Sequence, residues 1–222
     1  MASICFFAPL SYSNAALDGL AASARVFEKF GDEERDRIDR ISNADARSLS
    51  LGGLLALSAG VDDCCGPDFE RKIVRDKFGK PRFDGGDAPV FSISHSGGLS
   101  VAALSRCGEI GVDIEQIDDR RDICKIANRF FSQAEKERLS LAQDKERAFY
   151  AIWTAKEAMM KLGGEGMISV MSADSVCAEN SKERFFLKYR LLFEGEEYAL
   201  TVCASRFEEI TMIGTDGIDF LV

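Results

Sequence analysis

Apolar and polar residues recur with the period of an α-helix over residues 146–162, a stretch without glycine or proline. Gly163 and Gly164 follow directly and are expected to end the helix, because glycine adopts the left-handed cap conformation at little cost. One stripe of the helix is apolar and predicts its buried side: Ile152, Ala155, Met159 and Leu162. The second stripe places a tryptophan beside two charged residues: Trp153, Glu157 and Lys161. A helix with these two sides is expected to lie between the core and a cleft.

An alternation of apolar and polar residues at 110–115 predicts a half-buried β-strand. The alternation directs Asp113 and Glu115 to the same side of the strand, about 7 Å apart. Gly111 beside them allows a backbone or a ligand to approach closely. The strand therefore presents two neighbouring carboxylates that repel each other unless a cation neutralises them.

The remaining pattern combines helices with hairpins, which predicts an α+β fold. The expected helices are 14–30, the charge-rich and solvated stretch 32–40, 43–60 with Asn43 as its N-cap, 123–131, and one opened by the capping box of Ser132 and Glu135. The expected strands are a buried first strand at 2–9, a hairpin of 90–95 and 99–104, and a hairpin of 185–193 and 198–204. Residues 61–90 are expected to be irregular, with Lys80 on a turn set by Gly79 and Pro81.

Composition and charge narrow the class of protein. The chain has 222 residues, 46% of them hydrophobic, and a net charge of −9, which argues against general nucleic-acid binding and against a surface held on anionic lipid. No run approaches the roughly 20 apolar residues of a membrane helix, and the first residues lack the basic region of a signal peptide. Seven cysteines without a Cys-x-x-Cys pair, and a single histidine, disfavour a zinc site and indicate reduced thiols in a cytoplasmic protein.

The two charged clusters allow a structural and a chemical interpretation. Glu157 and Lys161 form an (i, i+4) pair, which contributes roughly 0.2–0.5 kcal/mol to a helix without any function. Asp113 and Glu115 are best tolerated where one cation neutralises both. A third carboxylate from a nearby helix would complete an all-oxygen site for a hard ion such as Mg²⁺.

Two further positions suit a phosphate ligand as well as an ordinary structural role. Lys80 lies on a turn, where an exposed lysine usually has no specific partner. His95, the only histidine, lies at a strand end beside Ser94, Ser96 and two glycines, a setting whose hydroxyl, imidazole and backbone donors suit an anion. The residues alone leave both interpretations open.

Four stretches together resemble the signature of the 4′-phosphopantetheinyl transferases, in the larger, surfactin-synthetase-activating (Sfp) type. They are Phe78-Gly-Lys-Pro, Phe91-Ser-Ile-Ser-His-Ser, Gly111-Val-Asp-Ile-Glu and Trp153-Thr-Ala-Lys-Glu-Ala-Met-Met-Lys, in the order and at the spacing of that family. Any one of them is weak, but the four together are highly specific. The resemblance implies an α+β fold of two pseudo-symmetric halves, 1–106 and 107–222. Each half would be a small antiparallel sheet packed with helices, with the active site in the cleft between them.

The resemblance also implies a reaction and its residues. Members of this family transfer 4′-phosphopantetheine from coenzyme A to a serine of an apo acyl or peptidyl carrier protein, with Mg²⁺, and release 3′,5′-ADP. The implied metal ligands are Asp113, Glu115 and Glu157, the implied catalytic residues are Glu157 and Lys161, and the implied coenzyme A contacts are Arg47, Lys80, Ser94, His95 and Lys161. Glu157, directly or through a metal-bound water, is the expected base for the serine proton. Two fused halves would make a monomer sufficient.

Several neighbouring residues receive supporting roles. Arg37 could also approach the nucleotide phosphates, although its acidic neighbours weaken its field. Lys156 points about 100° away from Glu157 on the helix and is expected to form a supporting ion pair. Trp153 is expected to be a packing residue. Phe130 and Phe131 are expected in the core, although a partly exposed phenylalanine there would be a candidate docking spot for a partner.

Two rival functions stay open on the sequence. The protein could be a non-catalytic module that binds coenzyme A or a carrier, or a metal-dependent phosphodiesterase, because carboxylate clusters with Mg²⁺ also cleave phosphate esters. The net charge of −9 and the lack of basic stretches count against a nuclease. No motif distinguishes among fatty-acid, polyketide and peptide-synthetase carriers.

Overall fold

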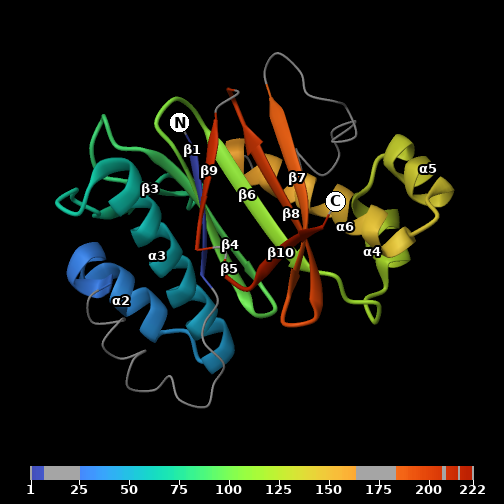
Figure 1. Ribbon diagram of the computed structural model, residues 1–222, viewed down its shortest axis with the longest axis horizontal. Coiled ribbons are helices and arrows are strands. Elements are labelled where there is room, and N and C mark those ends of the chain that lie inside the picture. The colour runs from blue at the N-terminus through green and yellow to red at the C-terminus, as the bar shows by residue number, and fades with distance from the viewer. Residues whose placement is uncertain (1, 8–25, 164–183, 207–208, 215, 222) are drawn as a thin grey trace. The chain divides into compact units, whose positions relative to one another are not determined.

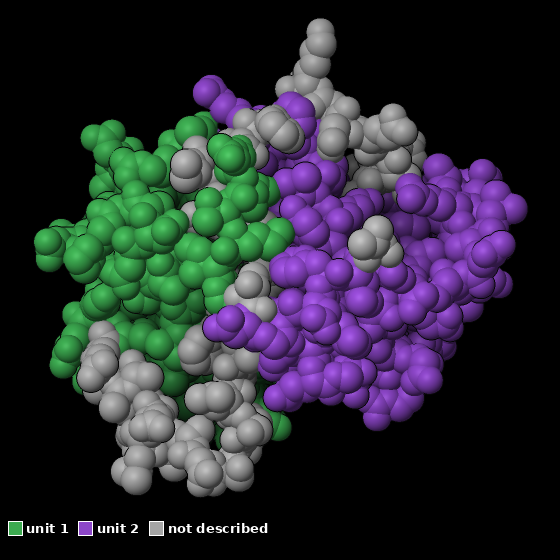
Figure 2. Space-filling model, viewed as in Figure 1, with its two compact units in different colours: residues 1–107, 208–215 green, residues 108–207, 216–222 purple. Residues whose placement is uncertain are grey.

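The computed structural model of the protein describes residues 2–7, 26–163, 184–206, 209–214 and 216–221 (Figure 1). The chain divides into two compact units, which Figure 2 shows in different colours. Unit 1 comprises Met1–Cys107 and Glu208–Thr215, and unit 2 comprises Gly108–Phe207 and Asp216–Val222. Among the described residues, each unit contains a four-stranded sheet covered by helices.

Unit 1 is built on a sheet with the strand order β4-β5-β1-β9. Its strands are β1 (Ala2–Phe7), β4 (Val90–Ser96), β5 (Leu99–Ser105) and β9 (Ile210–Ile213). β1 pairs antiparallel with β5 and parallel with β9, so the sheet is mixed. The short strands β2 (Ile73–Arg75) and β3 (Pro81–Phe83) form a separate antiparallel pair. The helices of this unit include α2 (Asp32–Asp39) and α3 (Ala44–Cys65), and residues 26–30 are also helical.

Helix α3 covers the sheet of unit 1 and provides much of its core (Figure 1). Gly53 lets the helix approach β4 closely, because a Cβ atom there would lie 2.6 Å from Cγ2 of Ile93. Beside this contact, the rings of Phe83 and Phe91 pack with their centroids 4.6 Å apart. Phe83 belongs to β3, so this aromatic contact fixes the short β2–β3 hairpin on the main core.

Helix α2 is tied to the β2–β3 hairpin by a buried carboxylate. Glu34 is 1% exposed and accepts hydrogen bonds from Arg75 of β2 and from Nε of Arg37, the latter at 2.7 Å. Burial alone would raise the pKa of Glu34, but the bonds from Arg75 and Arg37 outweigh it and hold the pKa below its usual value. The charge of Arg37 is therefore partly neutralised within the protein.

Unit 2 is built on an antiparallel sheet with the strand order β10-β7-β8-β6. Its strands are β6 (Ile110–Gln116), β7 (Phe185–Phe193), β8 (Glu196–Ala204) and β10 (Ile218–Leu221). Its helices are α4 (Ile123–Phe130), α5 (Gln133–Leu141) and α6 (Lys145–Gly163). α6 packs on β6 and β8, while α4 and α5 pack on α6. The long helix is therefore the central element of the unit.

The interface of α6 with α4 and α5 contains a cluster of aromatic rings. Phe149 stacks on Phe131 with centroids 5.2 Å apart and on Trp153 with centroids 6.0 Å apart. Phe130 meets the edge of Trp153 at 5.8 Å and is only partly buried. Phe131 is 5% exposed, which confirms its expected place in the core.

A fully buried ion pair joins α6 to α5. Nζ of Lys156 lies 3.0 Å and 2.8 Å from the two carboxylate oxygens of Glu135, and neither side chain is exposed to solvent. Oε2 of Glu135 also accepts a hydrogen bond from the backbone N–H of Ser132, which completes the expected capping box of α5. Lys156 thus has the supporting role that its position on the helix predicts.

The α+β class and most of the expected elements are confirmed. α3, α4, α5, α6 and both hairpins lie where the pattern places them, and Asn43 caps α3 by accepting a hydrogen bond from Ala46. Residues 2–7 of the strand expected at 2–9 form β1, and residues 26–30 of the helix expected at 14–30 are helical. The rest of both elements lies outside the described residues. None of the described helices is long and apolar enough to cross a membrane.

Two expectations about the fold are wrong, and one holds in part. Residues 61–90 are not irregular throughout, because α3 continues to Cys65 and β2 and β3 follow. β9 and β10 were not expected, and β9 makes the sheet of unit 1 mixed rather than purely antiparallel. The helix expected at 32–40 is present as α2 and is mostly exposed, although Glu34 and Ile38 are buried. β9 pairs with β1, and Glu34 accepts a hydrogen bond from Arg75, so contacts distant in sequence explain these two features.

We predict that Lys156→Met lowers the free energy of unfolding by roughly 3–5 kcal/mol, because Glu135 would stay buried without its cation. Urea unfolding followed by circular dichroism measures the change. Lys156→Met combined with Glu135→Gln should recover more than half of the loss, since the amide can still accept the bond from Ser132.

Lys125→Met provides the control for this pair. Lys125 is exposed on α4, so its replacement is expected to change the unfolding free energy by no more than about 0.5 kcal/mol. A loss of less than about 1 kcal/mol in Lys156→Met would contradict a stabilising role of the buried pair.

Candidate functional site

Strand β6 directs its two carboxylates toward helix α6. Val112 and Ile114 are 0% and 1% exposed, and they alternate with Asp113 and Glu115 along the strand. Asp113 lies opposite Thr201 of β8 in the ladder. Asp113 is 5% exposed and Glu115 is partly exposed. Asp113 therefore lies in the interior of the unit, and Glu115 lies nearer to the surface.

Gly111 sets the distance between β6 and α6. A Cβ atom at this position would lie 2.0 Å from the carbonyl oxygen of Ala158 and 2.6 Å from the backbone nitrogen of Leu162. The backbone of the strand therefore rests directly on the last turns of the helix, which only glycine allows. The close approach that the sequence predicts at Gly111 is made by a backbone of the protein itself.

This approach brings Asp113 and Lys161 together. Nζ of Lys161 lies 2.8 Å from Oδ1 of Asp113, and the lysine side chain is 27% exposed. A buried carboxylate is costly unless a cation and hydrogen bonds compensate it, and Lys161 supplies the cation and a hydrogen bond to Oδ1. Asp113 and Lys161 thus link the strand to the helix chemically as well as sterically.

Glu157 lies one turn before Lys161 on α6 and experiences the charge of the strand carboxylates. Its pKa is raised to about 7, first by burial and next by the negative charges of Asp113 and Glu115. The positive charges of Lys161 and Arg121 oppose this rise. Glu157 can therefore gain or lose a proton near neutral pH, which is the property of a proton acceptor in catalysis.

Glu115 is held by two side chains at the outer end of the site. Its Oε1 accepts a hydrogen bond of 3.2 Å from Nε1 of Trp153 and lies 3.5 Å from Nη1 of Arg121. The guanidinium of Arg121 lies over the ring of Trp153, with Cζ 5.6 Å from the ring centroid. Trp153 is thus more than the packing residue that its position predicts, because it also donates to a carboxylate of the site.

Arg121 is the residue of this cluster that the sequence did not indicate. It belongs to the polar link of residues 118–122, which joins β6 to α4. Arg120 and Arg121 are adjacent there, and nothing in the local pattern distinguishes one from the other. A weak signal was available: the link directly follows the strand that carries Glu115, so one of its cations could fold back toward that carboxylate.

The donor set fits a hard divalent ion, although the ion's ligands are not already grouped. Asp113, Glu115 and Glu157 offer only carboxylate oxygens, the donors that Mg²⁺ prefers. In the part of the chain that the structure describes, no three His, Cys, Asp or Glu side chains are arranged closely enough to hold a metal ion. Instead, Lys161 engages Asp113, and Trp153 and Arg121 engage Glu115. The fit therefore rests on the chemistry of the three carboxylates and on the effect of the Asp113 and Glu115 charges on the pKa of Glu157.

The residues expected to contact coenzyme A lie in unit 1. Ser94 is 6% exposed and His95 is exposed at the end of β4, while Arg47 is exposed in the first turn of α3. His95 pairs with Ser100 in the ladder, and the Ser100 hydroxyl donates a 2.9 Å hydrogen bond to the carbonyl of Leu49. This bond joins α3 to the start of β5, and Ser100 is the ladder partner of His95 at the end of β4, so Arg47 and His95 lie at the same end of the unit.

Lys80 lies on the hairpin turn between β2 and β3, as the sequence predicts. Oδ1 of Asp76 accepts hydrogen bonds from the backbone N–H groups of Phe78 and Lys80, at 2.8 Å and 3.0 Å. Gly79 has a φ of 86°, a left-handed conformation that glycine adopts without strain. The two hydrogen bonds and the conformation of Gly79 therefore fix the turn that carries Lys80.

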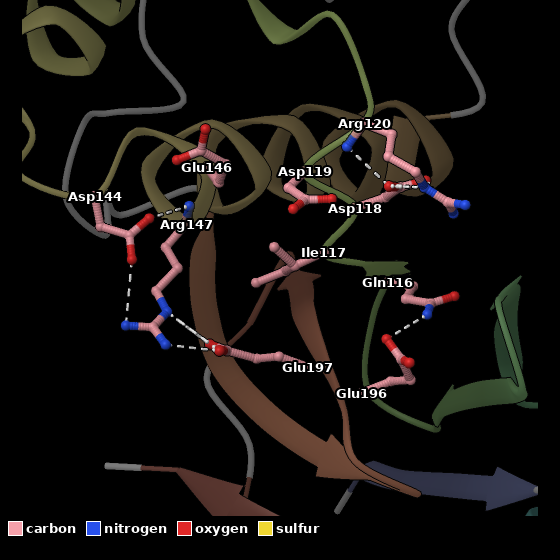
Figure 3. A pocket seen from close by; sticks show the side chains of 10 residues that line it. All are labelled: Gln116, Ile117, Asp118, Asp119, Arg120, Asp144, Glu146, Arg147, Glu196 and Glu197. Atoms are coloured by element: carbon pink, nitrogen blue, oxygen red, sulfur yellow. Dashed lines mark hydrogen bonds and ion pairs between the residues drawn. The ribbon is translucent and has the colours of Figure 1, made fainter.

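A cavity of about 620 Å³ opens just beyond β6, and its ten lining residues are labelled in Figure 3. The lining contains six acidic residues and two arginines. Both arginines are engaged, Arg120 by Asp118 and Arg147 by Asp144 and Glu197. An excess of negative charge repels phosphate groups, so this cavity does not suit an anionic ligand.

The part of the chain that carries the site is similar in sequence to known proteins. Residues 109–204 match the 4′-phosphopantetheinyl transferase superfamily, and this range lies within unit 2 and carries the strand and helix carboxylates. HetI of Nostoc sp. strain PCC 7120, named as a 4′-phosphopantetheinyl transferase, is 30% identical over 167 residues, which cover 72% of this chain and 67% of that protein. The chain belongs to the 4′-phosphopantetheinyl transferase superfamily.

Two further relatives carry the same name. The ffp protein of Bacillus subtilis is 29% identical over 203 residues, which cover 84% of this chain and 88% of that protein. AcpT of Salmonella typhimurium is 37% identical over 106 residues, which cover 47% of this chain and 55% of that protein. The chain thus spans about half of the length of AcpT, and the match to ffp extends over most of both chains.

We predict that Gly111→Ala lowers the free energy of unfolding by roughly 1–3 kcal/mol, because the methyl group would force β6 and α6 apart. Urea unfolding measures the loss. Gly86→Ala is the matched control, since a Cβ atom there meets nothing within 4 Å. Equal stability of the two variants would contradict the close packing of strand and helix.

The raised pKa of Glu157 predicts a pH-dependent stability in the absence of divalent ions. Because the folded state binds this proton more tightly than the unfolded state, its contribution is present below about pH 4.5 and is lost as the pH rises through about 7. The unfolding free energy of Glu157→Gln, relative to that of the wild type, should therefore increase by about 1–3 kcal/mol from pH 4 to pH 8. The partial exposure of Glu157 reduces this effect.

Urea unfolding at the two pH values, with a chelator present, measures this gain. Glu146→Gln, three turns earlier on the same helix, serves as the control for the loss of a carboxylate. A stability difference between Glu157→Gln and the wild type that stays the same at both pH values would contradict the raised pKa.

Proposed function

We propose that this protein transfers the 4′-phosphopantetheine group from coenzyme A to a serine of an apo acyl or peptidyl carrier protein and releases 3′,5′-ADP. One observation carries the proposal: Asp113 of β6 contacts Lys161 of α6, and the charges of β6 act on Glu157 of the same helix, within the range that matches the transferase superfamily. The names of the relatives support it. We place the enzyme in the cytoplasm and expect a monomer.

The proposal assigns a divalent ion, taken to be Mg²⁺, to Asp113, Glu115 and Glu157. When bound, such an ion neutralises negative charge on the diphosphate and on the leaving group. Lys161 would exchange its contact with Asp113 for the phosphate under attack, and its partly exposed position permits this movement. Without the ion, Asp113 is held by Lys161, and Glu115 is held by Trp153 and Arg121.

The reaction requires one proton transfer and one exchange of bonds at phosphorus. The serine hydroxyl oxygen attacks the phosphate that carries pantetheine, a new O–P bond forms, and the bond to 3′,5′-ADP breaks with its electron pair on the leaving phosphate oxygen. The serine proton passes to Glu157, whose pKa of about 7 suits a proton acceptor. Lys161 stabilises the negative charge that develops during the transfer.

The donor site is assigned to unit 1 by chemistry. Arg47 and Lys80 supply positive charge, and Ser94 and His95 supply hydrogen-bond donors, which together suit the phosphates of coenzyme A. We further propose that residues 1–106 and 107–222 are pseudo-symmetric halves and that the active site lies in the cleft between them. Each unit has a four-stranded sheet with one long helix, which supports the pseudo-symmetry.

We predict that Asp113→Asn and Glu157→Gln each reduce transfer at least about a hundredfold while the protein stays folded, because each removes a charge that the transition state requires. The measurement is the mass gain of an apo carrier protein incubated with coenzyme A and Mg²⁺. Asp119→Asn is the control, since Asp119 is exposed in the polar link and should leave transfer unchanged.

The same assay separates the rival functions. Binding of coenzyme A by the wild type without any mass gain on several carrier proteins would indicate a binding module. Cleavage of DNA without use of coenzyme A would indicate a phosphodiesterase. Full activity of Asp113→Asn or Glu157→Gln would contradict the assignment of the site.

A further inference from the structure

Arg121 has a fixed position although it belongs to a polar link. Its backbone N–H donates to the carbonyl of Asp118 at 3.3 Å, and its own carbonyl accepts from the N–H of Ile123 at 2.8 Å. This turn directs the side chain back over α6, where Cζ lies 5.6 Å from the ring centroid of Trp153 and 5.9 Å from that of Tyr150. Cation–π contacts with the two rings favour this position of the guanidinium before any ligand arrives.

The adjacent Arg120 has a different environment. Its side chain is 86% exposed and donates to both oxygens of Asp118, beside the acidic cavity of Figure 3. Arg121 instead lies 3.5 Å from Glu115, and its charge also lowers the pKa of Glu157. One of two neighbouring arginines therefore belongs to the carboxylate cluster, and the other belongs to the surface.

The charge of the cluster depends on Arg121. Asp113, Glu115 and Glu157 when ionised, with Lys161 and Arg121, carry one net negative charge, so a divalent ion would turn the site net positive. Without Arg121 the same ion would leave the site neutral. A diphosphate is attracted to a positive site and gains little from a neutral one.

We propose that Arg121 is a charge-balancing residue for donor binding: held on Trp153 and Tyr150, it makes the ion-loaded carboxylate site attractive to the diphosphate of coenzyme A. The inference rests on the proposed transferase function and adds a residue to it. It has a distinctive consequence, because removing a cation favours the binding of a metal cation and disfavours the binding of an anion. Loss of a merely structural contact would weaken both.

Two binding measurements test the proposal in Arg121→Met, which keeps an apolar side chain against the rings. Mg²⁺ affinity is followed by the fluorescence of Trp153, the only tryptophan of the chain, which donates to Glu115. Coenzyme A affinity is measured by calorimetry at saturating Mg²⁺. The dissociation constant of coenzyme A is expected to rise about tenfold, and that of Mg²⁺ to stay the same or fall.

Two further variants sharpen the result. Arg121→Lys keeps the charge and should hold the dissociation constant of coenzyme A within about threefold of the wild type. Arg120→Met removes the exposed neighbour and should change neither constant. Unchanged coenzyme A affinity in Arg121→Met, or a parallel weakening of both ligands, would overturn the charge-balancing role. Failure of the wild type to bind coenzyme A with Mg²⁺ would overturn the proposed function, and this inference with it.

Discussion

The candidate site depends on one steric contact, the backbone of β6 resting on the last turns of α6 at Gly111. A Cβ atom at this position would lie 2.0 Å from the carbonyl oxygen of Ala158, so the contact is possible only for glycine. It brings Asp113 within 2.8 Å of Lys161 and places Glu157 in the field of the strand carboxylates. A strand and a helix that each carry acidic residues are thereby held together despite the repulsion between them.

The two lysines at the C-terminal half of α6 illustrate how the helix combines stability with chemistry. Lys156 is fully buried against Glu135, an arrangement that fixes α5 on α6 and leaves no room for a ligand. Lys161 lies just over one turn further along, is 27% exposed, and engages a carboxylate of the site. Burial, together with the nearby acidic groups, raises the pKa of Glu157, which costs stability and supplies a group that titrates near neutral pH. Such a compromise is typical of functional sites.

The protein has a net charge of −9, yet its proposed donor is anionic. The two are compatible because charge is distributed unevenly over the structure. The large acidic cavity lies beyond the end of β6, whereas Lys161 and Arg121 lie beside the carboxylates of the site. Net charge governs long-range attraction, whereas binding depends on the charges within a few ångströms of the ligand. An acidic surface and a site for phosphates are therefore compatible.

The sequence by itself determined the features that depend on neighbours along the chain. The period of residues 146–162 gave α6, the alternation at 110–115 gave β6, and the capping residues Asn43 and Ser132 marked the starts of α3 and α5. The tertiary structure alone decided the short hairpin within 61–90, the strands β9 and β10, and which of two adjacent arginines turns toward Glu115. The physical reason is that periodicity and caps report local burial and local hydrogen bonding, whereas a short strand or an exposed cation takes its place from a partner distant in sequence.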